Sequence, residues 1–483
     1  MVAQGNGPHV VIFPYDEHGH VTPSFALGRA LTRVGIQVTG VLTATRYARV
    51  ASIASADRTP LFDIVAIPDS AEAGSSKQDD VCYQQSMQHL EPGLEELMLR
   101  LQPRPSCLMS DILFPWSQDI ADRLHIPRFH ICTFPAIIPL VLSYTPALYA
   151  RGLLPYRPEM ENELVDFIPG LPKLFKLCDV PNDFRSRDRQ QLEFLFEIMK
   201  GMKRAAGAII NTVYELEPEV VQSLVAKVGL IVYTLGSMSS LELDAPEACH
   251  LSCTVPGPAN GCSTTECLEW LNVQPLASVV YVALGSIVSF TEEEVQEMAL
   301  GLEASGQPFL WVLRQPPGGG DGKNVQVDLM SALPDGFLER NRERGRVISW
   351  APQTAVLAHP SLGCFLTHCG MASLLEALSA GVPMIGGFCK ISDQNTNLRL
   401  LSQEWEVAIP LSSPMSHQNI PLSSRVACCV KEVLHGERGR TLRRNALAMK
   451  STLGQAVSAP HGSSYLNLIK LAHAVINACA PSA

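Results

Sequence analysis

Long apolar stretches are missing from this chain. In its 483 residues, no apolar run reaches about 18 residues without a charge or a proline. The first apolar run, Val10–Phe13, is far too short for the core of a signal peptide. We therefore expect no membrane insertion, and we expect a cytoplasmic protein.

Basic residues are also in the minority. The chain has 37 Lys and Arg against 47 Asp and Glu, which gives a net charge of −10 at pH 7. This balance argues against nucleic acid or an anionic membrane as a general partner. An anionic ligand would have to be held by local dipoles and a few hydrogen-bond donors.

Metal-binding motifs are scarce. The chain has 14 cysteines, but none of them form paired C-x-x-C spacing, and there is no D-x-D motif. Cys249, Cys253, Cys262 and Cys267, with His250 nearby, leave a zinc site open as an alternative to free thiols in a linker. We favour reduced thiols and expect neither a metal nor a cofactor.

What the chain does contain is an alternation of strand and helix patterns in two halves. Its length is too great for one ordinary core and predicts two domains. The first half has two predicted strand–helix–strand units. The first consists of the strand His9–Pro14, a helix that starts at Thr22–Pro23, and the strand Ile36–Thr43. The second consists of the strand Cys107–Asp111, the helix Trp116–Leu124 and the strand Phe129–Thr133. Such alternation predicts a parallel sheet with helices on both faces.

The second half repeats this plan. Val279–Leu284 is a predicted strand, and Thr291 with Glu294 forms a capping box at the start of a helix that Gly306 ends. Phe309–Leu313 is the next predicted strand. We therefore predict an α/β protein with domains at 1–245 and 266–461, joined by a linker at 246–265.

The stretch from Trp350 to Gln394 is the most informative part of the chain. It reads WAPQTAVLAHPSLGCFLTHCGMASLLEALSAGVPMIGGFCKISDQ. A buried-looking strand, Gly363–Thr367, leads through the turn at 368–370 into a helix predicted to start near Ser373. A strand that ends in a glycine turn and feeds a helix points backbone N–H groups at a ligand, which is typical of a phosphate site.

This block resembles the signature box of the family 1 UDP-dependent glycosyltransferases, in the form typical of plant secondary metabolism. The resemblance rests on WAPQ, HPxxGxFxTHCG, S-x-x-E, GVP and the final DQ, and continues more weakly through GHVTP, the SD at 110–111, YVALGS and LPDGFLER. It implies the GT-B fold, in which two Rossmann-like doubly wound parallel-sheet domains face each other across a cleft. It also implies that the C-terminal helix, within 462–483, packs back on the first domain.

Two residues of the first half are candidates for catalysis. His20 follows the first strand in a predicted loop, and Asp111 ends another strand, so both are expected at the same edge of the sheet. An imidazole can take a proton from a hydroxyl, and a carboxylate can orient it and stabilise its charged form. The resemblance assigns these roles to His20 and Asp111. The alternative is that His20 only bonds its loop and that Asp111 caps the next helix.

The resemblance also implies a set of contacts to a UDP-sugar. It places Trp350 and the following Ala351 at the uracil, Gln353 and Glu376 at the ribose, Ser286, His368, Gly370 and Ser373 at the phosphates, and Asp393 and Gln394 at the hexose. Structural interpretations stay open: Trp350 as core, Ser373 and Glu376 as a capping box, and Asp393–Gln394 as an ordinary helix start.

The chain departs from the family pattern inside this block. The family reads HCGWNS, whereas this chain has Met371 and Ala372 before Ser373. Met371 is expected near the sugar, and Ala372 can offer a phosphate only its backbone N–H, because the side chain that reaches a phosphate is missing. Loss of such a bond costs on the order of 1.5–3 kcal/mol. One extra residue lies between Pro383 and Asp393, and Lys390 occupies a position that is apolar or small in the family.

The implied reaction is inverting transfer of a hexose, by default glucose, from a UDP-sugar to a hydroxyl of a small hydrophobic acceptor, such as a phenolic or a terpenoid. The product is a β-O-glycoside. Loops at 81–90, 134–149 and 184–199 are expected to form the acceptor pocket. A catalytically weak nucleotide- or metabolite-binding homologue is the alternative, favoured by the departures just described. A nucleotide-sugar epimerase is a more distant one.

Overall fold

The computed structural model describes residues 7–56, 59–69, 87–186, 188–242, 264–285, 290–314, 329–411 and 420–478. The chain divides into two compact units, Met1–Leu251 with Leu453–Ala483, and Ser252–Thr452. The predicted linker at 246–265 lies almost wholly outside the described residues, so its bounds stay predictions. None of the described helices is both long and apolar enough to cross a membrane.

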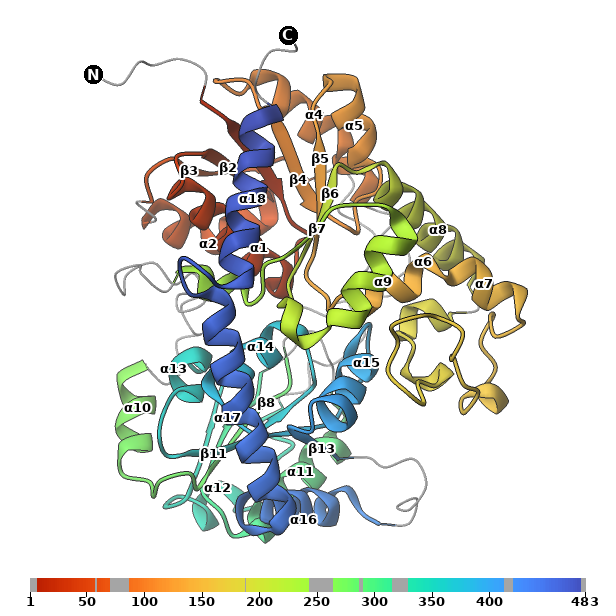
Figure 1. Cartoon of the computed structure of the whole chain (residues 1–483). Helices are drawn as coiled ribbons and strands as arrows, with labels where there is room; N and C mark the ends of the chain where they lie inside the picture. The colour runs from red at the N-terminus through yellow and green to blue at the C-terminus, as the bar shows by residue number, and fades with distance from the viewer. Residues whose placement is uncertain are drawn as a thin grey trace. The chain divides into compact units, whose positions relative to one another are not determined.

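The first unit contains a seven-stranded parallel sheet in the order β3-β2-β1-β4-β5-β6-β7. Its strands are β1 His9–Phe13, β2 Gln37–Thr43, β3 Phe62–Ile67, β4 Cys107–Asp111, β5 Arg128–Cys132, β6 Gly207–Ile210 and β7 Val232–Thr234. Its helices are α1 His18–Thr32, α2 Ala44–Ala56, α4 Glu91–Arg100, α5 Ser117–Leu124, α6 Ile137–Ser143, α7 Thr145–Ala150, α8 Arg189–Arg204, α9 Pro218–Val228 and α18 Ser463–Ala478 (Figure 1).

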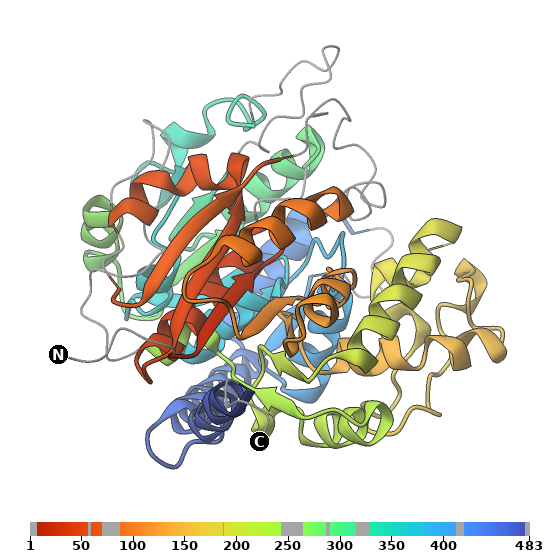
Figure 2. The ribbon, with the colours of Figure 1, turned by 90° about the horizontal axis from the view of Figure 1, so that it is seen from above.

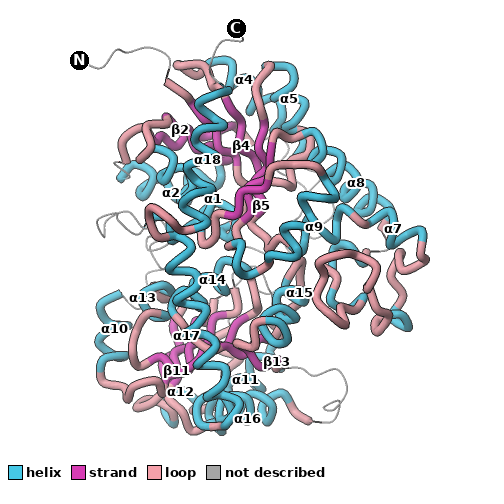
Figure 3. Tube along the Cα trace, in the orientation of Figure 1, coloured by secondary structure: helices cyan, strands magenta, loops and turns pink. Residues whose placement is uncertain are grey.

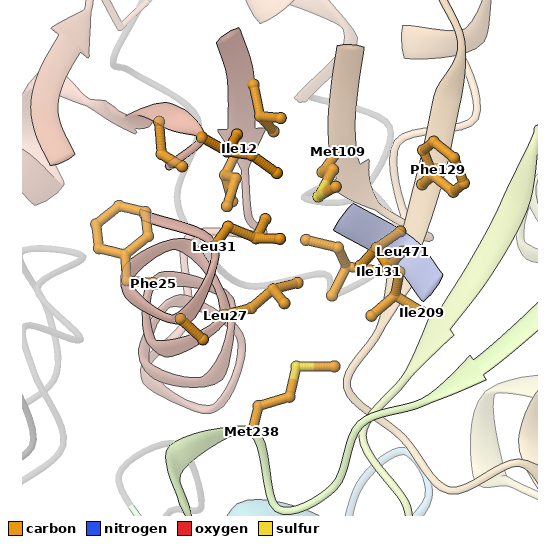
Figure 4. Packing of buried hydrophobic residues seen from close by; sticks show 14 of the residues in the cluster. Ile12, Phe25, Leu27, Leu31, Met109, Phe129, Ile131, Ile209, Met238 and Leu471 are labelled. Atoms are coloured by element: carbon orange, nitrogen blue, oxygen red, sulfur yellow. The ribbon is translucent and has the colours of Figure 1, made fainter. Parts of the chain in front are cut away.

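Helices cover both faces of this sheet (Figure 3). On one face, alternate strand residues such as Ile12, Met109 and Ile131 pack against Leu27 of α1 and Leu471 of α18 (Figure 4). On the other face, Phe13 and Leu108 belong to a separate core with α4 and α5. Strand residues alternate between the two faces, so both need apolar side chains, and this explains the nearly continuous apolar runs of the strands.

The last helix returns to the first unit. Leu468, Leu471, Ala472 and Val475 of α18 belong to the same core as β1, β4 and β5. In Figure 2, α18 is seen nearly end-on in dark blue beside the yellow-green β7, with which it is in contact. The C-terminal helix expected within 462–483 is therefore α18, and it packs in the core of the first unit.

The start of α1 differs from the prediction. The helix begins at His18, after Glu17 as its N-cap, so Thr22 and Pro23 lie inside it and His20 lies in its first turn. The sequence signals were misleading because a proline near the start of a helix removes only one hydrogen bond, here the bond to the carbonyl of Gly19.

The second unit contains a six-stranded parallel sheet in the order β10-β9-β8-β11-β12-β13. Its strands are β8 Val279–Ala283, β9 Phe309–Val312, β10 Gly345–Ile348, β11 Leu362–Thr367, β12 Met384–Gly386 and β13 Ala408–Pro410. Its helices are α10 Thr264–Asn272, α11 Glu292–Ser305, α12 Phe337–Arg340, α13 Gln353–Leu357, α14 Met371–Ala380, α15 Gln394–Arg399, α16 Leu422–His435 and α17 Glu437–Val457.

The capping box predicted for α11 is confirmed. The Thr291 hydroxyl accepts from the backbone N–H of Glu294, and the Glu294 carboxylate accepts from the N–H of Thr291, while Gly306 ends the helix in the left-handed conformation. The strand–helix–strand units predicted for the two halves are all present, as β1-α1-β2, β4-α5-β5 and β8-α11-β9.

The three segments expected to surround the acceptor are mostly not loops. Residues 81–86 lie outside the described part of the chain. The segment 134–149 forms α6 and α7, and α8 includes most of 184–199. Every residue of α6 is buried. The long apolar run was therefore a packed helix.

Candidate active site

The two residues predicted to carry catalysis are in direct contact. Nδ1 of His20 lies 2.7 Å from Oδ2 of Asp111. His20 is on the first turn of α1, directly after the loop from β1, and Asp111 is the last residue of the neighbouring strand β4. The parallel sheet brings them together at its carboxyl edge, as expected.

The carboxylate of Asp111 is held from several sides. Its Oδ2 also accepts from the N–H of Tyr15 at 3.3 Å, and its Oδ1 accepts from the N–H of Leu113 at 3.0 Å. The buried guanidinium of Arg128 donates to the backbone carbonyl of Asp111 at 3.1 Å. A buried carboxylate that accepts this many bonds is fixed in place.

The imidazole of His20 is enclosed except at one side. Its ring contacts the rings of Tyr15 and Phe134, with centroids 5.2 and 5.4 Å apart. The Thr133 hydroxyl lies 3.1 Å from the same Nδ1 that faces Asp111. The His20 side chain keeps 13% of its surface exposed and that of Asp111 none. Because Nδ1 faces Asp111, Nε2 is the candidate nitrogen to exchange a proton with a substrate.

A second buried carboxylate anchors the segment that touches His20. Glu217, only 3% exposed, accepts from the N–H groups of Ala136 and Ile137, both at 3.0 Å, and from the hydroxyl of Thr212 at 2.7 Å. Burial raises the pKa of Glu217, and these three donors oppose the rise. Glu217 therefore fixes the backbone at the start of α6, shortly after Phe134, whose ring contacts His20.

In the second unit, His368 follows β11 and lies between two glycines. A Cβ added to Gly285 or Gly370 would come within 2.8 or 2.5 Å of its Nε2, so both positions need glycine. Burial lowers the pKa of His368 to about 4, and the carbonyl of Ala283 opposes the change. The imidazole is therefore neutral at pH 7 and can offer an N–H donor without a positive charge.

The helix after this turn starts earlier than predicted. α14 begins at Met371 with Gly370 as N-cap, and no side chain caps it. Ala372 and Ser373 are thus its second and third residues, and their N–H groups belong to the first turn, where backbone donors lack intrahelical partners. The predicted start near Ser373 is wrong by two residues, because Met371 and Ala372 are themselves good helix formers.

The capping-box interpretation of Ser373 and Glu376 is also wrong. Neither residue caps α14; both accept hydrogen bonds from Nε2 of Gln353, at 3.0 and 2.7 Å. Oε1 of Gln353 in turn accepts from the hydroxyl of Tyr281 on β8, at 3.3 Å. Burial raises the pKa of Glu376, and the bond from Gln353 opposes the rise.

Trp350 and Ala351 lie just after β10. Trp350 is half-exposed and Ala351 is 5% exposed, so the indole is not part of a buried core. This position suits a base-stacking platform but does not test that role. Ser286 lies outside the described residues, and its predicted phosphate contact stays a prediction.

Asp393 and Gln394 lie at the start of α15 and are both buried. Oδ2 of Asp393 accepts from Nδ2 of Asn397 at 2.7 Å. Oε1 of Gln394 accepts from the N–H groups of Lys390 and Ile391, at 2.9 and 3.2 Å. The side-chain carbonyl oxygen of Gln394 is thus engaged by the backbone of the preceding loop. Any contact of this side chain to a sugar hydroxyl would use its NH₂ group.

The extra residue found in the sequence falls in this loop, and Lys390 fastens the loop to α11. Nζ of Lys390 lies 2.7 Å from Oε2 of Glu294 and 5.0 Å from the centroid of the Phe290 ring. Phe388 packs edge-on against the same ring at 5.3 Å. The position that is apolar or small in the family therefore carries a lysine with a structural partner.

No group of three or more His, Cys, Asp and Glu side chains in the described part of the chain is placed to hold a metal ion. The candidate zinc cluster lies outside the described residues except for Cys267, which is buried and not part of a disulfide.

Comparisons with known proteins agree with this geometry. A family model described as UDP-glucoronosyl and UDP-glucosyl transferase matches residues 250–449. The UDP-glycosyltransferase 85A7 of Arabidopsis thaliana is 32% identical over 98% of this chain and 98% of its own length. The chain belongs to the UDP-glycosyltransferase family.

Two further relatives of this family are informative. The (R)-mandelonitrile beta-glucosyltransferase of Prunus dulcis is 32% identical over 97% of both chains. The structure of Phytolacca americana UGT2 complexed with UDP-2fluoro-glucose and pterostilbene has a TM-score of 0.80, with 26% identity over 97% of this chain and 100% of that chain. The predicted GT-B fold, with two Rossmann-like domains, is confirmed, and the protein is a UDP-glycosyltransferase.

Sequence reasoning missed three residues of this UDP-glycosyltransferase site: Thr133, Glu217 and Tyr281. Thr133 directly follows β5 at the same sheet edge as Asp111, which was an available signal. Glu217 and Tyr281 reach the site only through hydrogen bonds to distant segments, and no local pattern marks them.

Proposed function

We propose that this UDP-glycosyltransferase transfers glucose from UDP-glucose to a hydroxyl of a small hydrophobic acceptor and inverts the anomeric configuration. The product is a β-O-glycoside. Nε2 of His20 takes the proton of the acceptor hydroxyl, the oxygen attacks the anomeric carbon, and UDP leaves from the opposite side. Asp111 stabilises the imidazolium that forms.

The single observation that carries this proposal is the 2.7 Å contact between His20 and Asp111. It fixes the ring through Nδ1, and we assign the proton transfer to Nε2. A histidine that only bonded its own loop would not need a fully buried carboxylate that also accepts from Tyr15 and Leu113. The aromatic rings around His20 provide a dry environment, in which a charge–charge interaction is stronger than in water.

The donor is proposed to bind the second unit. The diphosphate meets the first-turn N–H groups of α14, the neutral His368 and the Ser373 hydroxyl. Glu376, held by Gln353, takes the ribose hydroxyls, and Trp350 stacks on the uracil. These groups carry no net positive charge, so the helix dipole has the main part in holding the leaving group, and we propose no metal requirement.

The acceptor is proposed to be a phenolic or terpenoid alcohol. The aromatic rings of Tyr15 and Phe134 contact His20, and the buried helix α6 comes shortly after Phe134 in the chain. These apolar surroundings favour an acceptor with a flat or bulky apolar skeleton over a sugar or a peptide. The names of two similar proteins mention mandelonitrile, an aromatic cyanohydrin, and pterostilbene, a phenol, which supports a small aromatic acceptor. None of the nine cysteines in the described residues forms a disulfide, which suits the reducing cytosol that we propose.

The test is to incubate the purified protein with UDP-glucose and a panel of phenolic and terpenoid alcohols, and to measure UDP release and the product by mass spectrometry and NMR. A β-glycoside with at least one acceptor supports the proposal. UDP binding without release, for any sugar nucleotide and any acceptor, would instead support the alternative of a binding homologue, which Met371 and Ala372 favour.

A further inference from the structure

Two cysteines meet at the centre of the proposed donor site. Cys369 lies on the turn between β11 and α14, and Cys389 lies on the loop between β12 and α15. β11 and β12 are neighbours, with Thr367 opposite Gly386, so both loops leave the sheet at the same edge. Cys369 is completely buried, whereas Cys389 is partly exposed.

The two thiols lie near each other, because Cys389 bonds the residue that directly precedes Cys369, and the Cys389 side chain is the first cause that raises the pKa of Cys369. Sγ of Cys389 also donates to the carbonyl of His368 at 3.7 Å, and Sγ of Cys369 lies 3.9 Å from the carbonyl of Thr367. A Cβ added to Gly386 would lie 2.8 Å from Sγ of Cys369. The sulfurs therefore share the small space between the two strand ends.

Both loops carry residues assigned to the donor. Nδ2 of Asn397 donates to the carbonyl of Cys369 at 2.8 Å and to Oδ2 of Asp393 at 2.7 Å, which ties the turn to α15. Cys389 holds the carbonyl of His368. A covalent bond between the two sulfurs would pull on the proposed phosphate turn and the proposed hexose loop at the same time.

We propose that Cys369 and Cys389 form an oxidation site, at which a peroxide converts the two thiols into a disulfide and thereby weakens donor binding. This proposal rests on the proposed function of the surrounding residues as a donor site. It assigns oxidation to Cys389, and it makes the link between the two loops a means of regulating donor binding.

The chemistry balances as follows. The sulfur of Cys389 attacks one oxygen of hydrogen peroxide and gives up its proton; the O–O bond breaks, and a sulfenic acid and one water form. Cys369 then attacks the sulfenic sulfur, the S–O bond breaks, and a second water leaves. The two thiols lose two electrons and two protons in total, and the peroxide is reduced to two waters.

The order of attack follows from exposure and charge. Of these two cysteines, Cys369 is buried and Cys389 is the one that is partly exposed to a peroxide from solvent. The contact with Cys389, burial and the charge of Asp393 hold the pKa of Cys369 well above its usual range. Cys389 is therefore the attacking thiol and Cys369 the resolving one, an arrangement typical of cysteines that respond to oxidants.

The bond has a structural consequence for the donor. A disulfide holds its sulfurs about 2.05 Å apart, far closer than two thiols in contact, so the two loops must approach. The hydrogen bond from Cys389 to the His368 carbonyl is also lost. Because His368 lies between Gly285 and Gly370 with no spare room, a shift of this turn displaces its imidazole. We expect the affinity for UDP to fall at least about tenfold.

The experiment uses the full chain with UDP alone as the ligand. The protein is treated with hydrogen peroxide, mapped by mass spectrometry of its peptides without reduction, and titrated with UDP by calorimetry before treatment, after treatment and after dithiothreitol. The proposal predicts a Cys369–Cys389 cross-linked peptide, a loss of UDP affinity, and recovery of both on reduction. In Cys389→Ser, UDP affinity should not respond to peroxide, whereas the matched control Cys428→Ser, at an exposed thiol, should respond like the unchanged chain.

Two results would overturn the proposal: peroxide treatment that yields no cross-link between these cysteines, or a cross-link with unchanged UDP affinity. Cys389→Ser keeps the test decisive if changes at the buried Cys369 prevent folding. Neither readout needs turnover. A chain that never transfers glucose but loses UDP affinity on cross-linking would contradict the proposed function and leave the oxidation site intact.

Discussion

Nε2 of Gln353 lies 2.7 Å from Oε2 of Glu376, and this contact joins the start of α13 to the second turn of α14. The same amide donates to Ser373, and Tyr281 donates to its carbonyl oxygen. Gln353 therefore orients the carboxylate proposed to take the ribose hydroxyls. Because its amide is already engaged, we assign it mainly a positioning role.

Replacing Gln353 should weaken donor binding without removing catalysis. In Gln353→Leu, the carboxylate of Glu376 loses its donor in a buried position, which costs on the order of 1.5–3 kcal/mol. We expect the Kd of UDP and the KM of UDP-glucose to rise about ten- to a hundredfold, with a smaller change in kcat. Calorimetry and initial rates measure this, with Gln222→Leu on the exposed face of α9 as control; an unchanged UDP affinity would contradict the positioning role.

Restoring the missing side-chain donor should have the opposite effect. Ala372 is the second residue of α14, half-buried at the proposed phosphate site. In Ala372→Asn, an added amide bond to a charged phosphate should tighten UDP binding by about tenfold or more. Ala372→Val, which adds volume without a donor, is the matched control. Equal or weaker UDP binding in the asparagine variant would show that this gap is not what limits affinity.

Acid should destabilise the first unit through His130. This residue of β5 is fully buried, and burial, followed by the charge of Arg128, lowers its pKa to about 3 from an ordinary value near 6.5. Below pH 6.5, His130 is therefore protonated in the unfolded chain but stays neutral in the folded chain. The free energy of unfolding consequently falls as the pH drops toward 3. At pH 5 this effect amounts to about 2 kcal/mol.

The variant His130→Leu should lose less stability on acidification. We expect the fall in Tm between pH 7.5 and pH 5 to be smaller by several degrees in this variant than in the unchanged chain. His473→Leu, at an exposed position of α18, should behave like the unchanged chain. Parallel pH curves for all three proteins would show that His130 does not contribute.

Glu217 should affect turnover more than donor binding. Gln in its place can accept with one oxygen only, so the N–H groups of Ala136 and Ile137 can no longer both be paired as they are now. The segment that carries Thr133 and Phe134 would then position His20 less well. We expect Glu217→Gln to lower kcat about tenfold or more and to leave UDP affinity unchanged, with the exposed Glu219→Gln as control. A parallel loss of UDP affinity would point to general damage instead.

Much of the fold could be predicted because parallel strands buried on both faces give nearly continuous apolar runs. The strand at Cys107–Asp111 was predicted with its bounds correct, and the capping box of Thr291 and Glu294 marked α11. Helix starts were less accurate. The N-cap residues of α1 and α14, Glu17 and Gly370, make no side-chain capping bond, so sequence signals further along were mistaken for the beginning of each helix.

The site was predictable only where chemistry and sequence position coincide. His20 comes after β1 and Asp111 ends the neighbouring strand β4, so the order of the strands brings the two residues together. The partners of Gln353 were not predictable, because Ser373 and Glu376 have the spacing of a capping box and only the actual start of α14 excludes it. The contact between Cys369 and Cys389 depends on the register of β11 and β12, which no local pattern specifies.

The most direct test compares His20→Ala and Asp111→Asn with the unchanged chain, in UDP release from UDP-glucose with an accepted alcohol and in UDP binding by calorimetry. The account predicts that both variants lose about 10²–10⁴-fold in kcat, since each removes part of the proton transfer, while both bind UDP as before. If His20→Ala still released UDP and formed glycoside at the original rate, or if it lost UDP binding together with turnover, the role given to this imidazole would be contradicted.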